Sequence, residues 1–173
     1  MPLPGPLPKG VSFSESERGG DLTYHGPGQL VVYPICKLDG SGFGPNHDVA
    51  AFLRRLEGVL IDVIADLGLK GESRPDATGV WVGPKKLASI GIAVKKWVTY
   101  HGIAINAVND LAPFSLISPC GYSPEVMTRL SDLSPEWARK TGASWRGDLE
   151  SRMTLAFRKN VSLEPPHQTP SRG

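Results

Sequence analysis

The chain of 173 residues has little cysteine, little charge imbalance and no long apolar run. Its two cysteines, Cys36 and Cys120, are too few and too far apart for a metal knuckle or a secreted disulfide framework, which indicates a reducing compartment. A formal net charge of +2 argues against an extended nucleic-acid surface. Because we find neither a signal peptide nor a membrane-spanning run, we expect a cytoplasmic protein that binds neither nucleic acid nor membrane.

Nucleotide-binding motifs are also absent. The stretch Arg18–Gln29 holds four glycines and a proline, but it precedes a predicted strand, Leu30–Ile35. A P-loop or a dinucleotide fingerprint has its glycines after a strand and opening a helix, so phosphate binding is disfavoured. A backbone with so few side chains still allows a ligand to lie directly against it, the alternative being a tight turn or a bulge.

The order of the predicted elements indicates the fold class. Strand-like segments rich in β-branched and aromatic residues are clustered between helical segments rather than alternating with them. This order predicts an α+β fold with a mixed, largely antiparallel sheet flanked by helices. The expected elements are strands at Leu30–Ile35, Leu69–Arg74, Gly79–Val82, Lys85–Val94, Trp97–His101 and Ile103–Val108, a helix at His47–Leu67 capped by Asn46 and ended by Gly68, and closing helices at Glu125–Leu130 and from Ser134, with Gly142 and Gly147 as candidate breaks.

The domain organisation follows from length and from proline content. A chain of this length can bury a full core as one domain, which we place at residues 1–163. Its first ten residues are rich in proline and glycine, and we expect them to be extended and disordered. The same composition predicts a disordered tail at residues 164–173.

Cys120 is the candidate nucleophile. A single cysteine is by default a small buried hydrophobic residue, which is our interpretation of Cys36. Cys120 fits that default less well, because Pro119 and Gly121 place it where the chain turns. A free thiol, with a pKa of roughly 8.5, is only slightly ionised at neutral pH, so a reactive cysteine needs a cationic neighbour.

The candidate neighbours are lysine and histidine. Strand alternation directs Lys86 to one face and Leu87 to the other, which aims the lysine into a cleft. The alternative is a lysine on a hairpin turn after Gly83-Pro84, which we accept for Lys85. His25 is an alternative base, and His101 a candidate for a pocket wall. From chemistry alone, these residues indicate acyl transfer.

Five motifs, in this order along the chain, resemble the lipoyl(octanoyl) transferase family, the octanoyltransferases of lipoate biosynthesis. The resemblance implies the fold shared with biotin and lipoate ligases. It also implies transfer of an octanoyl group from octanoyl-acyl carrier protein to a lysine of lipoyl domains in 2-oxoacid dehydrogenase complexes and of the glycine cleavage H protein. The motifs are Arg18–Gln29, Gly79–Gly83, Lys86–Gly91, His101–Asn106 and Pro119-Cys120-Gly121.

The resemblance also implies roles for individual residues. Cys120 matches the nucleophile that takes the acyl group as a thioester, and Lys86 matches its catalytic partner. We expect no cofactor and no metal, because exchanging one thioester for another needs no nucleotide, and we expect a monomer. The matching substrate-binding residues are Arg18, Gly19, Gly20, Asp21, Leu22, Thr23, Tyr24, His25, Ser89, Ile90, Gly91, Gly102, Ile103 and Ala104.

The chain departs from the family before Arg18. Only seventeen residues precede it, too few for the family's strand, helix and strand. We expect the recorded start to lie inside a longer reading frame, the alternative being a shortened product with an open acyl slot. Two other functions stay open: an ATP-dependent lipoate-protein ligase of the same fold, and an inactive module that binds carrier or lipoyl domains. Cys120 and the ending His25-Gly-Pro-Gly-Gln29 favour the transferase.

Overall fold

The structure is a computed structural model, and it describes residues 10–20, 22–41, 44–75, 77–117 and 123–160. Five strands form one sheet in the order β1-β5-β4-β3-β2, and every pair of neighbouring strands is antiparallel. The predicted α+β class with a largely antiparallel sheet is therefore confirmed. The strands are β1 (Gln29–Val32), β2 (Gly71–Arg74), β3 (Ala77–Val82), β4 (Lys85–Lys95) and β5 (Val98–Asn106).

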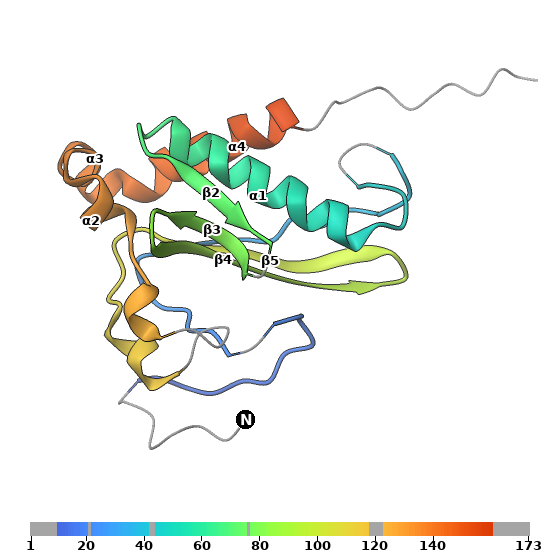
Figure 1. Cartoon of the computed structure of the whole chain (residues 1–173), viewed down its shortest axis with the longest axis horizontal. Helices are drawn as coiled ribbons and strands as arrows, with labels where there is room; N and C mark the ends of the chain where they lie inside the picture. The colour runs from blue at the N-terminus through green and yellow to red at the C-terminus, as the bar shows by residue number, and fades with distance from the viewer. Residues whose placement is uncertain (1–9, 21, 42–43, 76, 118–122, 161–173) are drawn as a thin grey trace, which may run out of the picture.

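The sheet separates a helical layer from an irregular one (Figure 1). Helices α1 (Val49–Ala65) and α4 (Trp145–Asn160) cover one face, and the segment that precedes β1 runs along the other. The core lies between α1 and the sheet, because α1 repeats apolar residues at helical spacing. Its fully buried members include Phe52, Leu56, Leu60, Leu30, Val80, Leu87 and Ile105.

The start of α1 differs from the sequence prediction. Asp48, not Asn46, is the N-cap, and its Oδ1 accepts a hydrogen bond from the Ala51 backbone N–H at 2.8 Å. His47, predicted to be helical, has a φ of +51° and lies outside the helix. An aspartate satisfies one of the free N–H groups of the first turn, which explains why the helix begins after it. Gly68, with a φ of +75°, lies in the turn that follows α1.

Strand β5 corrects a second prediction. The sequence predicted two strands separated at Gly102, but Val98–Asn106 is continuous and Gly102 is paired with Gly91 of β4. The glycine is needed for close approach rather than for a turn. A Cβ at Gly102 would lie 2.2 Å from the carbonyl oxygen of Val32, at the end of β1.

The segment after residue 122 contains more short elements than expected. The helix predicted at Glu125–Leu130 is wrong: a 3₁₀ turn, η3 (Pro124–Val126), is followed by extended backbone and by α2 (Leu130–Leu133). The extended part exists because the Thr128 N–H donates to the Lys86 carbonyl at 3.0 Å. The predicted helix start at Ser134 is confirmed by α3 (Pro135–Thr141), which Gly142 ends, whereas Gly147 lies inside α4. The remaining short elements are η1 (Ala112–Leu116) and η4 (Gly142–Ser144).

Among the described residues, no helix combines the length and the apolar character needed to cross a bilayer. The predicted disordered segments at residues 1–10 and 164–173 fall outside the described residues, apart from Gly10.

Replacing the N-cap of α1 tests the corrected helix boundary. We expect Asp48→Ala to lower the free energy of unfolding by about 1 kcal/mol, because the Ala51 N–H loses its acceptor. The matched control is Asn46→Ala, at the position that the sequence pattern favoured, which should change this free energy by less than about 0.5 kcal/mol. Urea unfolding followed by circular dichroism measures both, and equal effects would contradict the assignment.

Candidate functional site

A cavity of about 320 Å³ brings together segments that are distant in sequence. Its walls come from the glycine-rich segment before β1 (residues 18–28) and the residues just before it, from β1 and its end, from β4 and from β5. Of the predicted substrate-binding residues, it is lined by Arg18, Gly20, Thr23, His25, Ser89, Ile90, Gly91, Gly102, Ile103 and Ala104. Ser14, Ser16, Val31, Tyr33 and His101 complete the lining.

The other predicted site residues lie elsewhere or outside the described part. Leu22 and Tyr24 line a neighbouring cavity of about 300 Å³, with Thr23 and His25 shared between the two. Asp21 and Cys120 fall outside the described residues, so the predicted contact between Lys86 and Cys120 stays a prediction.

Gly19 attaches the glycine-rich segment to the sheet. Its N–H donates to the carbonyl of Ile92 in β4 at 2.9 Å. This edge of β4 is accessible because β3 pairs with β4 only as far as Ser89. A Cβ at Gly91 would lie 3.0 Å from the Gly19 carbonyl oxygen, so a larger residue there would push the two backbones apart.

Gln29 fixes the shape of the glycine-rich segment. This side chain is buried, and its Nε2 donates to the Tyr24 carbonyl at 3.1 Å and to Asn106 Oδ1 at 2.7 Å. Its Oε1 accepts from the Gly26 N–H at 3.3 Å and lies 3.2 Å from His25 Nδ1. A single amide therefore holds the loop and the His25 ring against β5.

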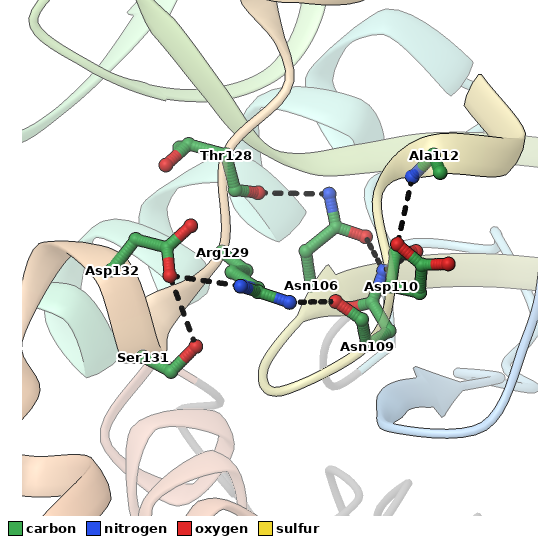
Figure 2. A network of polar contacts seen from close by, with 8 residues as sticks. All are labelled: Asn106, Asn109, Asp110, Ala112, Thr128, Arg129, Ser131 and Asp132. Carbon is green, nitrogen blue, oxygen red and sulfur yellow. Dashed lines mark hydrogen bonds and ion pairs between the residues drawn. The ribbon is translucent and has the colours of Figure 1, made fainter. Parts of the chain in front are cut away.

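The polar network continues on the other side of Asn106 (Figure 2). Asn106 Nδ2 donates to the Thr128 carbonyl at 3.0 Å, and Asn109 Nδ2 donates to Asn106 Oδ1 at 3.3 Å. Arg129 then donates to the Asn109 carbonyl at 2.8 Å. The Thr128 N–H in turn donates to the backbone carbonyl of Lys86. A chain of hydrogen bonds therefore connects the glycine-rich segment to the backbone of the predicted catalytic lysine.

Lys86 is completely buried. Its Nζ lies 5.7 Å from the centroid of the Trp81 ring, within range of a cation–π interaction. The β3–β4 pairs Val80–Ala88 and Trp81–Lys86 leave Leu87 as an extra residue, a β-bulge. The bulge interrupts the alternation expected from sequence and explains why three consecutive residues, Lys86 to Ala88, are all buried. Lys85 is exposed and donates to the Glu125 carbonyl at 2.6 Å, in agreement with the interpretation of it as a residue beside the turn.

Two histidines lie at the cavity. The pKa of His25 is lowered, mainly because the ring is partly desolvated. The hydrogen bond with Gln29 raises this pKa, whereas the nearby Arg18 and His101 lower it further. His101 has a φ of +61°, and its ring packs against Tyr100 and Tyr33, with centroid separations of 5.0 and 6.0 Å. The lowered pKa makes His25 a neutral imidazole at neutral pH.

Cys36 differs from a reactive cysteine. Partial burial raises the pKa of its thiol, although a contact with Thr99 Oγ1 at 3.4 Å acts against this rise. The thiol therefore stays protonated, which agrees with its interpretation as a small packing residue. In the part of the chain that the structure describes, no three His, Cys, Asp or Glu side chains are grouped as metal ligands would be.

Comparison with known proteins identifies the family. Residues 7–141 match the lipoyl protein ligase A/B catalytic domain. The chain belongs to this family. It is 47% identical over 125 residues to an octanoyltransferase of Geobacter metallireducens, covering 72% of this chain and 57% of that protein. It is 50% identical over 119 residues to an octanoyltransferase of Gloeobacter violaceus, covering 69% of this chain and 52% of that protein.

Solved structures show the same fold. A lipoate-protein ligase A bound with ATP superposes with a TM-score of 0.61 at 16% identity, over 83% of this chain and 56% of that one. A bi-partite lipoate protein ligase from Thermoplasma acidophilum gives a TM-score of 0.61 at 16% identity, over 83% and 55%. The predicted lipoate-ligase-like fold is confirmed. The chain spans about half the length of the curated relatives first matched.

The residues of the hydrogen-bond network that joins the cavity to Lys86 were not identified from the sequence. Gln29 and Asn106 lay inside recognised motifs, but no local pattern indicates that their amides are joined. Thr128 and Arg129 lie in a segment predicted to be helical. The available signal was the presence of amide side chains at positions that the strand pattern makes buried, since buried amides require partners.

Gly102→Ala tests the close approach that shapes the cavity wall in this lipoyl ligase family member. Because the added Cβ would lie 2.2 Å from the Val32 carbonyl oxygen, we expect the free energy of unfolding to fall by about 1–3 kcal/mol. Gly147→Ala, in α4 with open space around it, is the matched control and should stabilise by about 0.5–1 kcal/mol. Denaturant unfolding measures the free energy of unfolding of both variants. A Gly102→Ala variant as stable as the original chain would contradict the prediction, because it would show that the ends of β1 and β5 move apart at no cost.

The protonation of His25 tests the electrostatics of the site. Its folded pKa lies below its ordinary value of 6.5, so the unfolded chain binds the proton more tightly. The contribution of His25 to stability is therefore present above pH 6.5 and is lost as the pH falls through the lowered pKa. An NMR titration of the ring should give a midpoint below 6.5, which Arg18→Gln should raise. A midpoint at or above 6.5 in the unmodified chain would refute the prediction.

Proposed function

We propose that this chain carries the acyl-transfer site of an octanoyltransferase. Its donor is octanoyl-acyl carrier protein, and its acceptors are lysines of lipoyl domains in 2-oxoacid dehydrogenase complexes and of the glycine cleavage H protein. One observation supports this most strongly. The glycine-rich segment, β4 and β5 line one cavity, and β4 also carries the completely buried Lys86. The octanoyltransferases similar to this chain support the same reaction.

The proposed reaction has two steps. The Cys120 thiolate attacks the carrier thioester, a new carbon–sulfur bond forms, and the carrier thiol leaves with a proton from the Lys86 ammonium. The amine of the acceptor lysine then attacks the Cys120 thioester, giving an amide, and its proton returns to Lys86 as the Cys120 thiolate leaves. Lys86 thus acts first as acid and then as base. The cycle consumes no nucleotide.

The cavity suits an alkyl chain. Val31, Ile90, Ile103 and Ala104 supply apolar surface, and the glycines at 91 and 102 expose backbone that a hydrocarbon can approach. Burying one methylene contributes about 0.8 kcal/mol, so an octanoyl tail contributes on the order of 5 kcal/mol before losses of entropy. Recognition of the acyl group is therefore assigned to this cavity, and reaction to Lys86 and Cys120.

Mass spectrometry of the intact protein tests the proposal. After incubation with octanoyl-acyl carrier protein, the chain should gain one octanoyl group that hydroxylamine removes. Cys120→Ala should abolish this adduct, and the matched control Cys36→Ala should retain it. Lys86→Met should slow acylation by about 100-fold or more, the usual contribution of a positioned acid or base.

The two alternatives give different results in the same assay. Modification of a lipoyl domain that requires ATP and free lipoate, without an adduct on Cys120, would establish a ligase. Binding of a lipoyl domain that leaves its lysine unmodified would establish an inactive module. Either result would overturn the transferase mechanism.

A further inference from the structure

Two charged residues, Glu57 and Lys86, are buried within the described part of the chain. Glu57 is 1% exposed and Lys86 is 0% exposed. Removing a charge from water is unfavourable unless hydrogen bonds or an opposite charge offset the loss, so a buried charged residue marks a candidate functional position. These two residues come from different layers, α1 and β4, and both lie against Gly79 of β3.

Glu57 supplies a hydrogen bond that the sheet does not provide. Between the β2–β3 pairs Glu72–Trp81 and Arg74–Ala77, the single residue Ser73 faces three residues of β3, with Gly79 in the middle. Gly79 consequently has no β2 partner in the described pairing. Its N–H donates instead to Glu57 Oε1 at 3.1 Å. The helix therefore satisfies a backbone group that this bulge leaves free.

The other oxygen of the same carboxylate is also held. Arg54 Nη1 donates to Glu57 Oε2 at 2.5 Å, and the Arg54 side chain is about half exposed. Glu57 is thus oriented from both sides, by a guanidinium at the protein surface and by a backbone N–H in the interior. Charge-assisted hydrogen bonds of this kind are the stronger ones, so the β3 backbone is held firmly at Gly79.

Lys86 packs against the same glycine. Gly79 has a φ of +130°, and a Cβ there would lie 2.3 Å from the Ala88 carbonyl oxygen and 3.0 Å from Lys86 Cε. The bare backbone of Gly79 is therefore a wall for the methylene stem of the lysine. A shift of β3 at this point would change the space in which the ammonium group is held.

We propose that Glu57 is a positioning residue for Lys86. Its hydrogen bond keeps the bulged β3 backbone at Gly79 against the stem of the lysine and so fixes where the Lys86 amine lies. Glu57 does not line the described cavity, so it acts through Gly79 and Lys86 rather than on the substrate. The inference rests on the proposed acyl transfer, in which Lys86 moves protons.

Two substitutions separate the hydrogen bond from the charge. Glu57→Gln keeps an oxygen that can accept from Gly79 N–H, whereas Glu57→Leu has a similar volume and no acceptor. We expect the leucine variant to lose about 100-fold in kcat, because misplacement of a reacting group by about 1 Å has this effect. Its KM for octanoyl-acyl carrier protein should be unchanged. The glutamine variant should stay within about threefold of the original kcat.

Leu60→Ala is the control for stability. Leu60 is a completely buried residue of α1, and its removal leaves a cavity in the core while Glu57, the acceptor of the Gly79 N–H, is kept. It should lower the melting temperature at least as much as Glu57→Leu and leave kcat per folded molecule unchanged. A leucine variant with unaltered kcat, or a glutamine variant as inactive as the leucine one, would overturn the proposal.

NMR of the lysine side chain gives a test that does not depend on activity. The Lys86 methylene signals, assigned by their loss in Lys86→Met, should be shifted by the nearby Trp81 ring. They should keep this shift in Glu57→Gln and move toward the values of exposed lysines in Glu57→Leu. If these shifts behave as expected but the original chain transfers no acyl group, the proposed function fails and the positioning role stands. Unchanged Lys86 signals in Glu57→Leu would refute the positioning role alone.

Discussion

The burial of the Lys86 amine is the constraint on which the surrounding structure depends. Taking an ammonium group out of water opposes folding by several kcal/mol unless nearby groups offset the loss. The Trp81 ring is one such group, within 5.7 Å of the lysine nitrogen. The stem also needs space, which exists only because residue 79 is a glycine with a backbone conformation that other residues rarely adopt.

Two irregularities of the sheet meet at this lysine. The extra residue Leu87 interrupts the β3–β4 ladder next to Lys86. Gly79 of β3, two residues from Trp81, has no partner in β2 and interrupts the β2–β3 ladder. Bulges redirect side chains and are frequent beside active sites. The irregularity in β3 leaves the Gly79 N–H without a partner in β2, and Glu57 from α1 accepts from it. The Lys86 carbonyl lies beyond the last β4–β5 pair, at Ala88, and accepts from the Thr128 N–H in the segment before α2.

The lysine and the cavity form one connected unit. Gln29 holds the glycine-rich segment, Asn106 joins Gln29 to Thr128, and Thr128 holds the backbone of Lys86. Both buried amides accept and donate at once, so neither can rotate without breaking bonds to two elements. This arrangement explains how an irregular segment with few side chains forms a defined wall opposite β4 and β5.

The sequence predicted the parts of this arrangement that depend on local pattern, and it missed those that depend on pairing between distant segments. Apolar periodicity located α1, but two polar residues competed for its cap, and Asp48 rather than Asn46 has the hydrogen bond. Gly102 was predicted to separate two strands, but a glycine can serve either a turn or a close approach of two backbones. Only the position of β1, whose Val32 carbonyl lies against Gly102, decides between them. The bulges, and therefore the role of Glu57, depend on register across three strands, which no local pattern reports.

His101 shows how the cavity wall tolerates an unfavourable backbone. A φ of +61° raises the energy of a residue with a Cβ by roughly 1 kcal/mol or more, yet this histidine lies in a continuous strand beside Gly102. Its ring packs against Tyr33 and Tyr100, and Tyr100 donates to Glu17 at 2.7 Å, just before the glycine-rich segment. The strained residue thus lies where the strand, the end of β1 and the glycine-rich segment meet. The contacts with Tyr33 and Tyr100 hold the His101 ring, and the imidazole lies in the cavity lining.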